Sequence, residues 1–352
     1  MLGKRMGNRA LVWGAMCASL PDMDALIVPW LDTANALWWH RGPSHSLVVI
    51  GVGSYVLAPW MAKLWKRDKI SKALAGWFLA VAWGTHVLID GFTVYGTSLG
   101  WPLMPHRVAF NQLFIIDWFF TMPMLVACVW LAFLRTKKQA PKRRRLNAWG
   151  LGIAAAYVLL SGGIKRVASA GFDADLAKRG VIYERRMETP TPLNILLWRS
   201  VVDCGGDFWV GYRSVFDGRE SPVRWTIYPK GHDAVAGMSD LRECKRLQWF
   251  TDGWWIARAH AQGAWIGDMR FDEVRIWGDK KGMVDSRLTF AWNLNPNAIG
   301  DRLQPLHMAS MNFGDTLKRM AARIVGNRSA WEANPRLAGV TGSLPEFLAV
   351  TE

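Results

Sequence analysis

The chain has 352 residues, and 51% of them are hydrophobic. This length and apolar content exclude a disordered chain and leave room for two domains. A formal net charge of +15 is typical of nucleic-acid-binding proteins. The basic residues of the first half, however, gather in two short loops, 63–72 and 135–145, as they do in the cytoplasmic loops of membrane proteins. We therefore expect no nucleic-acid partner.

The first half of the chain consists of long apolar runs. Five of them are near or slightly below the length that crosses a bilayer: 11–31, 47–61, 73–92, 113–134 and 146–161. Beyond about residue 165, charges of both signs are mixed and turn residues are frequent. We predict a mainly α, multi-pass membrane helical bundle over 1–165 and a small, soluble, β-rich domain over 166–352, which makes the chain α+β.

The basic loops predict the topology, because loops rich in lysine and arginine stay on the cytoplasmic side of a membrane. With 63–72 and 135–145 inside, the third apolar run leads outward, the fourth leads inward, and the run 146–161 exits again. We therefore expect a multi-pass membrane protein whose carboxy-terminal domain is extracytoplasmic.

Ionisable residues are few in the membrane half, where residues 1–165 contain six aspartates, four histidines and no glutamate. Such groups are costly at membrane depth unless they pair, bind metal or face water, so each is a functional candidate. Most of them fall into four clusters, which the predicted topology places on the outer side: Asp22 with Asp24, the run His40–Ser46 (HRGPSHS), His86 with Asp90 and Thr93, and Asp117.

The spacing within these clusters suits metal binding. His86 and Asp90 are four residues apart, so a helix projects both from one face, where they can ligate one ion or simply hydrogen-bond to each other. In the HRGPSHS run, the Gly-Pro turn can bring His40 and His45 to one centre while Arg41 stays free. The alternative for this run is a loop whose histidines and arginine are merely solvated.

Asp22 and Asp24 follow a proline at the end of an apolar run. One carboxylate can ligate while the other orients a histidine or accepts a proton, and the alternative is that both cap a helix. Asp117 by itself is more often a hydrogen-bonding residue than a ligand. Histidines and carboxylates together suit a divalent ion such as zinc, with manganese and iron as alternatives, better than they suit magnesium or calcium.

These inferences define the expected site. The predicted metal ligands are Asp22, Asp24, His40, His45, His86 and Asp90. The predicted catalytic residues are Asp22 or Asp24 as a general base and Arg41 as the group that holds a phosphate or an oxyanion. Secondary candidates are Ser44, Thr93 and Asp117.

The second half carries the alternation of β-strands over 208–212, 225–228, 249–250 and 254–256. Asp252-Gly253 lies between the last two and predicts a hairpin turn. A small, largely antiparallel β domain is expected.

Three further features of this half are predicted. An amphipathic pattern over 316–325 indicates a short helix, and the tail after Asn327 is expected to be irregular. Cys204 and Cys244 can form a disulfide if this half is exported.

The order of the motifs is more specific than any one of them. PDMD, HRGPSHS, H-x3-D-x2-T-x-YGT, Trp101-Pro102 and the IID at 115–117 together resemble the YdjM-like family of integral inner-membrane proteins, which are regarded as metal-dependent hydrolases. The resemblance covers about residues 1–165. The segments 189–194, 197–199 and 268–270 resemble members that carry a carboxy-terminal extension.

The resemblance has three implications. It implies a location in the bacterial inner membrane, so that the extracytoplasmic carboxy-terminal domain is expected to be periplasmic. It implies metal dependence at the six predicted ligands. Members also begin with a further apolar helix bearing Thr-His or Thr-Gln, ahead of the turn that corresponds to Gly3–Asn8. This chain starts at that turn, so we expect the helix to be encoded upstream of Met1 or to be lost.

Residues and resemblance together predict an integral-membrane, metal-dependent hydrolase that uses metal-activated water on a membrane-accessible ester or phosphoester. Its expected partners are the lipid bilayer and a lipid-like or membrane-accessible substrate, and the oligomeric state stays open. One alternative is a proton or ion transporter built on the same His/Asp set, although the polar groups gather at one end of the runs and do not line a path across. The other alternative is a non-catalytic, membrane-anchored binding module.

Overall fold

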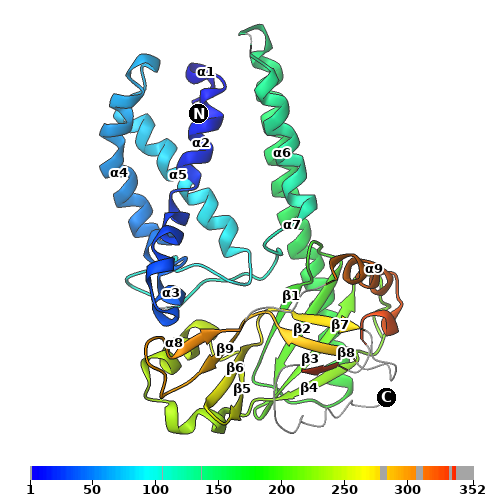
Figure 1. The fold of residues 1–352 in the computed structure, drawn as a ribbon. Coiled ribbons are helices and arrows are strands. Elements are labelled where there is room, and N and C mark those ends of the chain that lie inside the picture. The colour runs from blue at the N-terminus through cyan, green and yellow to red at the C-terminus, as the bar shows by residue number, and fades with distance from the viewer. Residues whose placement is uncertain are drawn as a thin grey trace. The chain divides into compact units, whose positions relative to one another are not determined.

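The computed structural model describes residues 2–104, 106–135, 137–277, 284–306, 312–332 and 335–337. The chain divides into two compact units, one formed by 1–31 with 38–160 and the other by 32–37 with 161–352. Figure 1 shows helices in the first unit and, in the second, the strands that follow α7.

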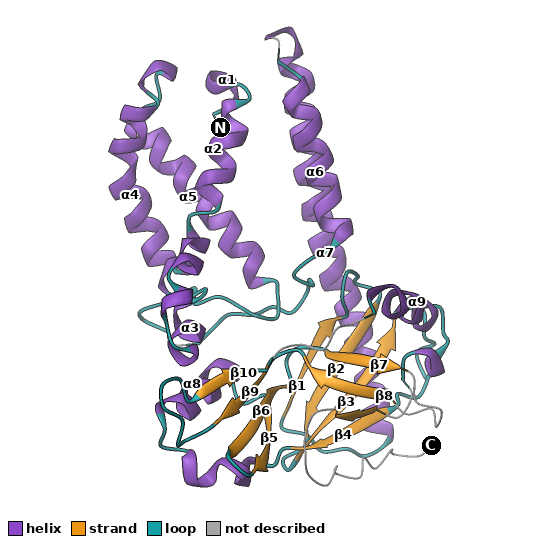
Figure 2. Cartoon of the chain, in the orientation of Figure 1, coloured by secondary structure: helices purple, strands orange, loops and turns teal. Residues whose placement is uncertain are grey.

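The first unit is helical (Figure 2). Its helices, of which α3 and α7 extend into the second unit, are α1 (Gly3–Met6), α2 (Arg9–Ala18), α3 (Thr33–Trp39), α4 (Leu47–Leu64), α5 (Lys72–Gly91), α6 (Trp118–Phe133) and α7 (Ala140–Lys178). Short 3-10 segments connect them, and two of these carry motif residues: η1 (Pro21–Leu26) and η3 (Pro43–His45).

Three helices of the described chain, α4, α5 and α7, are long and apolar enough to cross a membrane. The pair formed by Arg9–Ala18 and Pro21–Trp30 passes the same test as a span bent by 58°, and α6 is apolar but shorter. The expected helical membrane half is therefore confirmed in this form. The predicted run 113–134 is only partly helical, because α6 begins at Trp118 and Asp117 caps it.

The outward faces of these helices are apolar. Tyr55 on α4, Phe133 on α6 and Leu159 on α7 are each more than 70% exposed. Side chains of this kind are stable against lipid, whereas an exposed apolar surface of this extent in water is unfavourable. The faces that pack against one another are buried, with Met61 of α4 and Trp65, which follows that helix, in one cluster with Leu79 of α5.

The second unit contains three sheets. The first has the antiparallel order β1 (Arg185–Pro190), β2 (Leu197–Asp203), β3 (Asp207–Ser214) and β4 (Trp225–Pro229). The second, also antiparallel, has the order β10 (Leu303–Pro305), β9 (Ala291–Leu294), β6 (Gly263–Asp268) and β5 (Trp255–His260). The third has the order β11 (Pro335–Leu337), β8 (Val284–Leu288) and β7 (Glu273–Trp277), and its β11–β8 pair is parallel. The predicted β-rich second half is confirmed, and so are strands at 208–212 and 225–228.

The helix α7 continues well beyond the apolar run that predicted it, from Ala140 to Lys178. Its last turns belong to the second unit, where the Asp175 carboxylate accepts hydrogen bonds from Val223 N at 2.9 Å and Trp225 Nε1 at 2.8 Å. The apolar run ends near Ser161 because the following helical turns contain charged residues. The helix continues there because its buried face packs onto the first sheet through Phe172.

The hairpin predicted at Asp252-Gly253 is wrong. Residues 249–250 lie in α8 (Arg242–Thr251), and Asp252 ends that helix in the left-handed conformation with φ 51°. A helix C-terminus and a tight hairpin both require positive φ, so the Asp-Gly pair fits either structure. Phe250 is buried, which the helical face explains as well as a strand would.

The carboxy-terminal predictions have mixed outcomes. The amphipathic helix is confirmed as α9 (Phe313–Ile324). The tail after Asn327 is not wholly irregular, because it contains the 3-10 segment Arg328–Ala330 and the strand β11; residues 338–352 lie outside the described residues. Cys204 and Cys244 are free thiols in the structure.

Buried charges join the first and third sheets. The Arg199 guanidinium, which is fully buried, donates to Glu273 Oε1 at 2.8 Å, and the Tyr212 hydroxyl donates to Glu273 Oε2 at 2.6 Å. Asp272 Oδ1 lies 3.3 Å from Arg199 Nε, and the Arg275 guanidinium lies over the Tyr212 ring. We call these five residues the closed cluster, because both oxygens of Glu273 accept hydrogen bonds from within it.

Candidate metal centre

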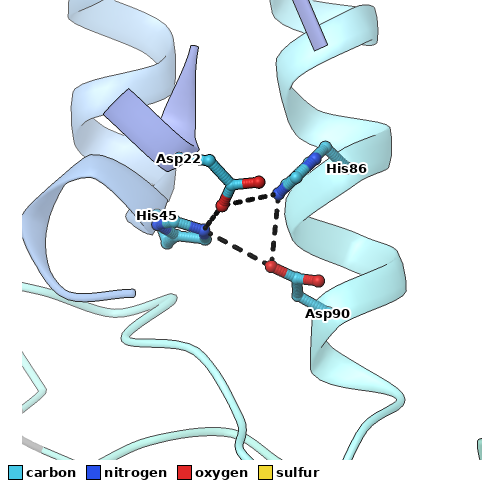
Figure 3. Close-up of side chains that lie close together, drawn as sticks. All are labelled: Asp22, His45, His86 and Asp90. Carbon is cyan, nitrogen blue, oxygen red and sulfur yellow. Dashed lines mark ion pairs between the residues drawn. The ribbon is translucent and has the colours of Figure 1, made fainter. Parts of the chain in front are cut away.

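Four ionisable side chains of the first unit converge on one point: Asp22, His45, His86 and Asp90 (Figure 3). Asp22 comes from η1, His45 from η3, and His86 and Asp90 from consecutive turns of α5. One potential ligand atom from each lies within 4.8 Å of all the others. Three segments far apart in the sequence therefore build a single group, which we call the metal centre.

Nitrogen and oxygen atoms alternate around this centre. His45 Nε2 lies 3.5 Å from Asp22 Oδ1 and 3.4 Å from Asp90 Oδ2. His86 Nε2 lies 3.4 Å from Asp22 Oδ1 and 3.3 Å from Asp90 Oδ2. Ligands at about 2.0–2.2 Å from a tetrahedral ion are about 3.3–3.6 Å from one another, and these four of the six separations lie in that range. The other two, between the histidines and between the aspartates, are within 4.8 Å.

The ligand atoms also lack other partners. His45 Nε2, His86 Nε2 and Asp90 Oδ2 are buried, and none has a hydrogen-bond partner among the described residues. A buried polar atom without a partner costs about 1–3 kcal/mol, and more when it is charged. Three such atoms aimed at one point are explained if a cation binds between them.

The opposite side of His45 fixes which nitrogen faces the centre. His45 Nδ1 lies 2.9 Å from Ser44 Oγ, and the Ser44 hydroxyl donates to Asp24 Oδ2 at 3.0 Å. Because that hydroxyl proton is used on Asp24, Ser44 accepts a hydrogen bond from Nδ1–H. His45 Nε2 is thereby left with a free lone pair, as a metal ligand requires.

The sequence HRGPSHS shapes the turn that positions these groups. Arg41 has φ 52°, in the left-handed region that non-glycine residues seldom adopt. Gly42 follows, where a Cβ atom would lie only 2.5 Å from the Trp38 carbonyl oxygen. The Trp83 indole nitrogen donates to the Ser44 carbonyl at 3.0 Å, which ties the turn to α5.

Arg41 lies beside the centre and is buried. Its Nη2 is 3.2 Å from Asp90 Oδ1, and its Nη1 donates to Thr93 Oγ1 at 3.2 Å. Its backbone N–H donates to Asp24 Oδ2 at 2.8 Å. Asp24 thus accepts bonds from the turn and does not belong to the group of four, while Thr93 and Ser44 act as supports of Arg41 and His45.

Two predicted residues lie elsewhere. His40 is outside the group of four, with its Nδ1 3.3 Å from Asp24 Oδ1 and its side chain 34% exposed. Asp117 caps α6, accepting from the backbone N–H groups of Phe119 and Phe120, and its other oxygen accepts from the Tyr157 hydroxyl at 2.9 Å. These bonds give Asp117 a structural role.

Sequence reasoning missed Trp83, Tyr95 and Arg107. Arg107 Nη2 donates to the His40 carbonyl at 2.7 Å, and its guanidinium lies 5.0 Å from the centroid of the Tyr95 ring. The only available signal was that Tyr95 belongs to the YGT motif. Nothing in the sequence linked Arg107 to the HRGPSHS run.

The centre and the basic loop occupy opposite ends of α5. His86 and Asp90 lie in its last turns, whereas Lys72 begins it, and Arg9 at the start of α2 pairs with Asp68 in the preceding loop at 3.1 Å. Twenty helical residues span about 30 Å, which is about the thickness of the bilayer core.

Apolar helices of membrane-crossing length and a partly buried His/Asp group that can hold a metal ion define a membrane protein with a candidate metal site. The family model described as YdjM inner membrane protein matches residues 1–168, which confirms the resemblance inferred from the motifs for this part of the chain. No curated protein and no solved structure gives a significant match to the chain.

Proposed function

We propose that the protein is an integral-membrane, metal-dependent hydrolase acting on a membrane-accessible ester or phosphoester. The observation that carries this proposal is the alternating ring of histidine nitrogens and carboxylate oxygens, 3.3–3.5 Å apart, at the metal centre. Two imidazoles and two carboxylates are a donor set that suits zinc, with manganese or iron as alternatives. A divalent cation held there supplies Lewis-acid activation of water at neutral pH.

The exposure of the side chains indicates how a substrate reaches the centre. Asp22 is 47% exposed at its side chain, whereas His45 is completely buried. His86 is 21% exposed, so the open side of the centre lies toward Asp22 and His86. Asp22 is therefore well placed to take a proton from an entering water.

His40 and Asp24 supply a second proton-transfer element. An imidazole that is partly exposed and oriented by a carboxylate is the usual general acid or base of hydrolases. Asp24 Oδ1 lies 3.3 Å from His40 Nδ1, and Asp24 Oδ2 accepts a hydrogen bond from the Ser44 hydroxyl. We therefore assign Asp24 as a positioning residue, and Asp22 and His40 as the candidates for proton transfer.

The proposed topology places this centre at the periplasmic face of the inner membrane. Its support is the separation of the basic loop at 63–72 from the metal centre along α5, since basic loops stay on the cytoplasmic side. Reporter fusions after Gln139 and after Gly180 test it. We expect the first to report inside and the second outside, and the reverse result would contradict this placement.

Metal content tests the centre directly. The full chain purified in detergent is expected to hold about one divalent ion, as a high-affinity site does. His45→Ala and Asp90→Ala are expected to lose it, whereas Asp117→Asn, which changes a buried carboxylate outside the centre, is expected to keep it. Equal, negligible metal in all four proteins would refute the metal centre.

Hydrolysis is measured on the same preparations with a p-nitrophenyl carboxylate ester and with p-nitrophenyl phosphate. We expect turnover that depends on added metal and is lost in His45→Ala. Turnover that is unchanged in this variant would contradict the assignment. Proton or ion flux in proteoliposomes that is abolished by Asp90→Asn, with no hydrolysis of either ester, would instead favour the transporter alternative.

A further inference from the structure

Two arginines from separate loops meet at one aromatic ring next to the metal centre. The Arg41 guanidinium carbon lies 5.3 Å from the centroid of the Tyr95 ring, and that of Arg107 lies 5.0 Å from it. Arg41 belongs to the HRGPSHS turn, and Arg107 to the connection between α5 and α6. The turn holds Arg107 directly, because Arg107 Nη2 donates to the His40 carbonyl.

Arg41 faces the centre in a constrained state. Its side chain is only 10% exposed, and its backbone adopts the left-handed conformation. Two of its nitrogens are engaged with Asp90 and Thr93, while its buried Nε has no hydrogen-bond partner among the described residues. Strained, incompletely bonded residues of this kind concentrate at ligand sites.

The charges around the ring depend on the metal. Without a cation, the three carboxylates of Asp22, Asp24 and Asp90 exceed the two guanidiniums. With a divalent ion at the centre, the same carboxylates face four positive charges, which leaves an excess of one. A loaded centre therefore attracts an anion to the guanidinium side, where the low exposure of Arg41 strengthens the interaction.

We propose that Arg41 and Arg107 form a subsite for a phosphate group next to the metal centre, and that the substrate is a phosphate monoester. The inference rests on the proposed function for its meaning, since it names the substrate class of the same centre. Guanidinium forks match the oxygens of phosphate, and a phosphate monoester carries about −1.5 to −2 charges near neutral pH. A neutral carboxylic ester would leave the excess charge unmatched.

Binding of inorganic phosphate to the metal-loaded full chain in detergent tests the subsite, with calorimetry as the readout. Arg107→Gln is expected to weaken binding about tenfold or more, as loss of a charge-assisted hydrogen bond does. Arg107→Lys keeps the charge but loses the forked guanidinium. Its affinity for phosphate is expected to lie between that of the unmodified chain and that of Arg107→Gln. Arg9→Gln is the matched control: it removes one arginine at the far end of α2, and its affinity for phosphate should equal that of the unmodified chain.

Metal content and thermal unfolding are measured on each preparation, so the two ideas can fail separately. An unmodified chain without metal would overturn the proposed function. A chain that holds metal, but binds phosphate equally well in Arg107→Gln and Arg9→Gln, would overturn the subsite alone. If Arg107→Gln fails to fold, the Arg107→Lys variant is used to test the subsite. A phosphate affinity of Arg107→Lys equal to that of the unmodified chain would contradict recognition by the forked guanidinium.

The phosphate group can come from a lipid headgroup or from a soluble ester. Methyl phosphate and dihexanoyl phosphatidic acid below its micellar concentration share the phosphate monoester and differ in the apolar tail. Tighter binding of the lipid would identify a headgroup, and equal binding would identify a soluble ester. Both affinities are expected to fall in Arg107→Gln, and loss of this dependence in both arms would overturn the proposal.

Discussion

The metal centre, which is partly buried, and the closed cluster are both groups of ionisable side chains, yet their atoms find partners in opposite ways. In the closed cluster, Arg199 and Tyr212 donate to both oxygens of Glu273. The two buried nitrogens that lack a hydrogen bond there, Arg199 Nε and Arg275 Nε, belong to guanidiniums that are paired with Asp272 and Glu273. At the metal centre, three buried ligand atoms have no hydrogen-bond partner in the described part of the chain. A cluster whose opposite charges pair within the protein stabilises a fold, whereas one whose unsatisfied ligand atoms converge on one point is arranged for a ligand.

The largest expected effect is on the closed cluster. Glu273→Ala leaves the buried guanidinium of Arg199 without its main partner, and breaking a buried pair in this way costs about 3–5 kcal/mol. The measurement is the free energy of unfolding of the full chain in detergent. Glu220→Ala, an exposed glutamate, is the control and should change stability by less than about 0.5 kcal/mol. A similar cost for both variants would erase the distinction between the two kinds of cluster.

The metal centre should behave in the opposite way and gain stability from outside. A saturating divalent ion at about 100 times its dissociation constant stabilises the folded chain by about 2.7 kcal/mol. Thermal unfolding with and without metal measures this gain. We expect the gain to vanish in His45→Ala and to persist in Glu273→Ala. Stabilisation of equal size in the His45→Ala chain would place the ion elsewhere.

A support of the centre should have an intermediate effect. Ser44→Ala removes the hydroxyl between His45 Nδ1 and Asp24, and loss of such an outer hydrogen bond lowers metal affinity about 10- to 100-fold. Competition with a fluorescent chelator gives the affinity. Ser54→Ala, which removes a buried hydroxyl of α4, is the control. Unchanged affinity in Ser44→Ala would mean that the tautomer of His45 is fixed in another way.

The closed cluster should also give the second unit a pH dependence. Burial raises the pKa of Asp272 to about 7 although Arg199 opposes the shift. The folded chain then keeps a proton that the unfolded chain releases above about pH 4, so this residue lowers stability as pH rises from about 4 to about 7. The slope is at most about 1.4 kcal/mol per pH unit. Asp272→Asn should lack this decline, and an identical pH profile in the variant would contradict the shift.

Glu273 should act in the other direction and at lower pH. Burial alone would raise its pKa, but Arg199 and Arg275 outweigh burial and lower it to about 2. Its contribution to stability is therefore present above about pH 4.5 and is lost as pH falls toward 2. The two neighbouring carboxylates thus separate into different pH windows.

The smallest effect is expected where charges are paired in water. Asp315 and Arg319 are four residues apart on α9 and lie 2.8 Å apart, but both are partly exposed. Such pairs contribute about 0.3–0.5 kcal/mol, so Asp315→Asn should barely change the free energy of unfolding. A loss comparable to that of Glu273→Ala would show that burial is not what distinguishes the clusters.

Residue types and spacing predicted which side chains come together. They did not predict which of them face the metal centre and which only support it. His86 and Asp90 follow directly from the helical repeat of α5. Asp22 and Asp24 are harder to separate. Residues two apart in a 3-10 segment point about 120° away from each other, and the sequence does not say which one faces the centre. The same limit applies to His40 and His45, since the choice between them depends on the left-handed conformation of Arg41.

Long-range partners were the other gap. Arg107 reaches the HRGPSHS turn from the connection that follows α5, and a single sequence contains no signal for that contact. In the second half, the residue pattern predicted β3 and β4, although burial does not alternate strictly along either strand. The hairpin predicted at Asp252-Gly253 was wrong because this pair, which readily adopts positive φ, is common both at helix C-termini and in hairpin turns.

The HRGPSHS turn has a consequence for how this half of the chain can vary in length. Surface loops ordinarily accept inserted or deleted residues. Here three positions of the turn are each constrained by a different neighbour. The Arg41 backbone N–H donates to Asp24, the Trp38 carbonyl leaves no room for a side chain at Gly42, and the Ser44 carbonyl accepts from Trp83. One residue inserted between Arg41 and His45 would move His45 relative to the metal centre and would also disturb these three contacts. This turn should therefore have a fixed length, even where individual side chains are replaced.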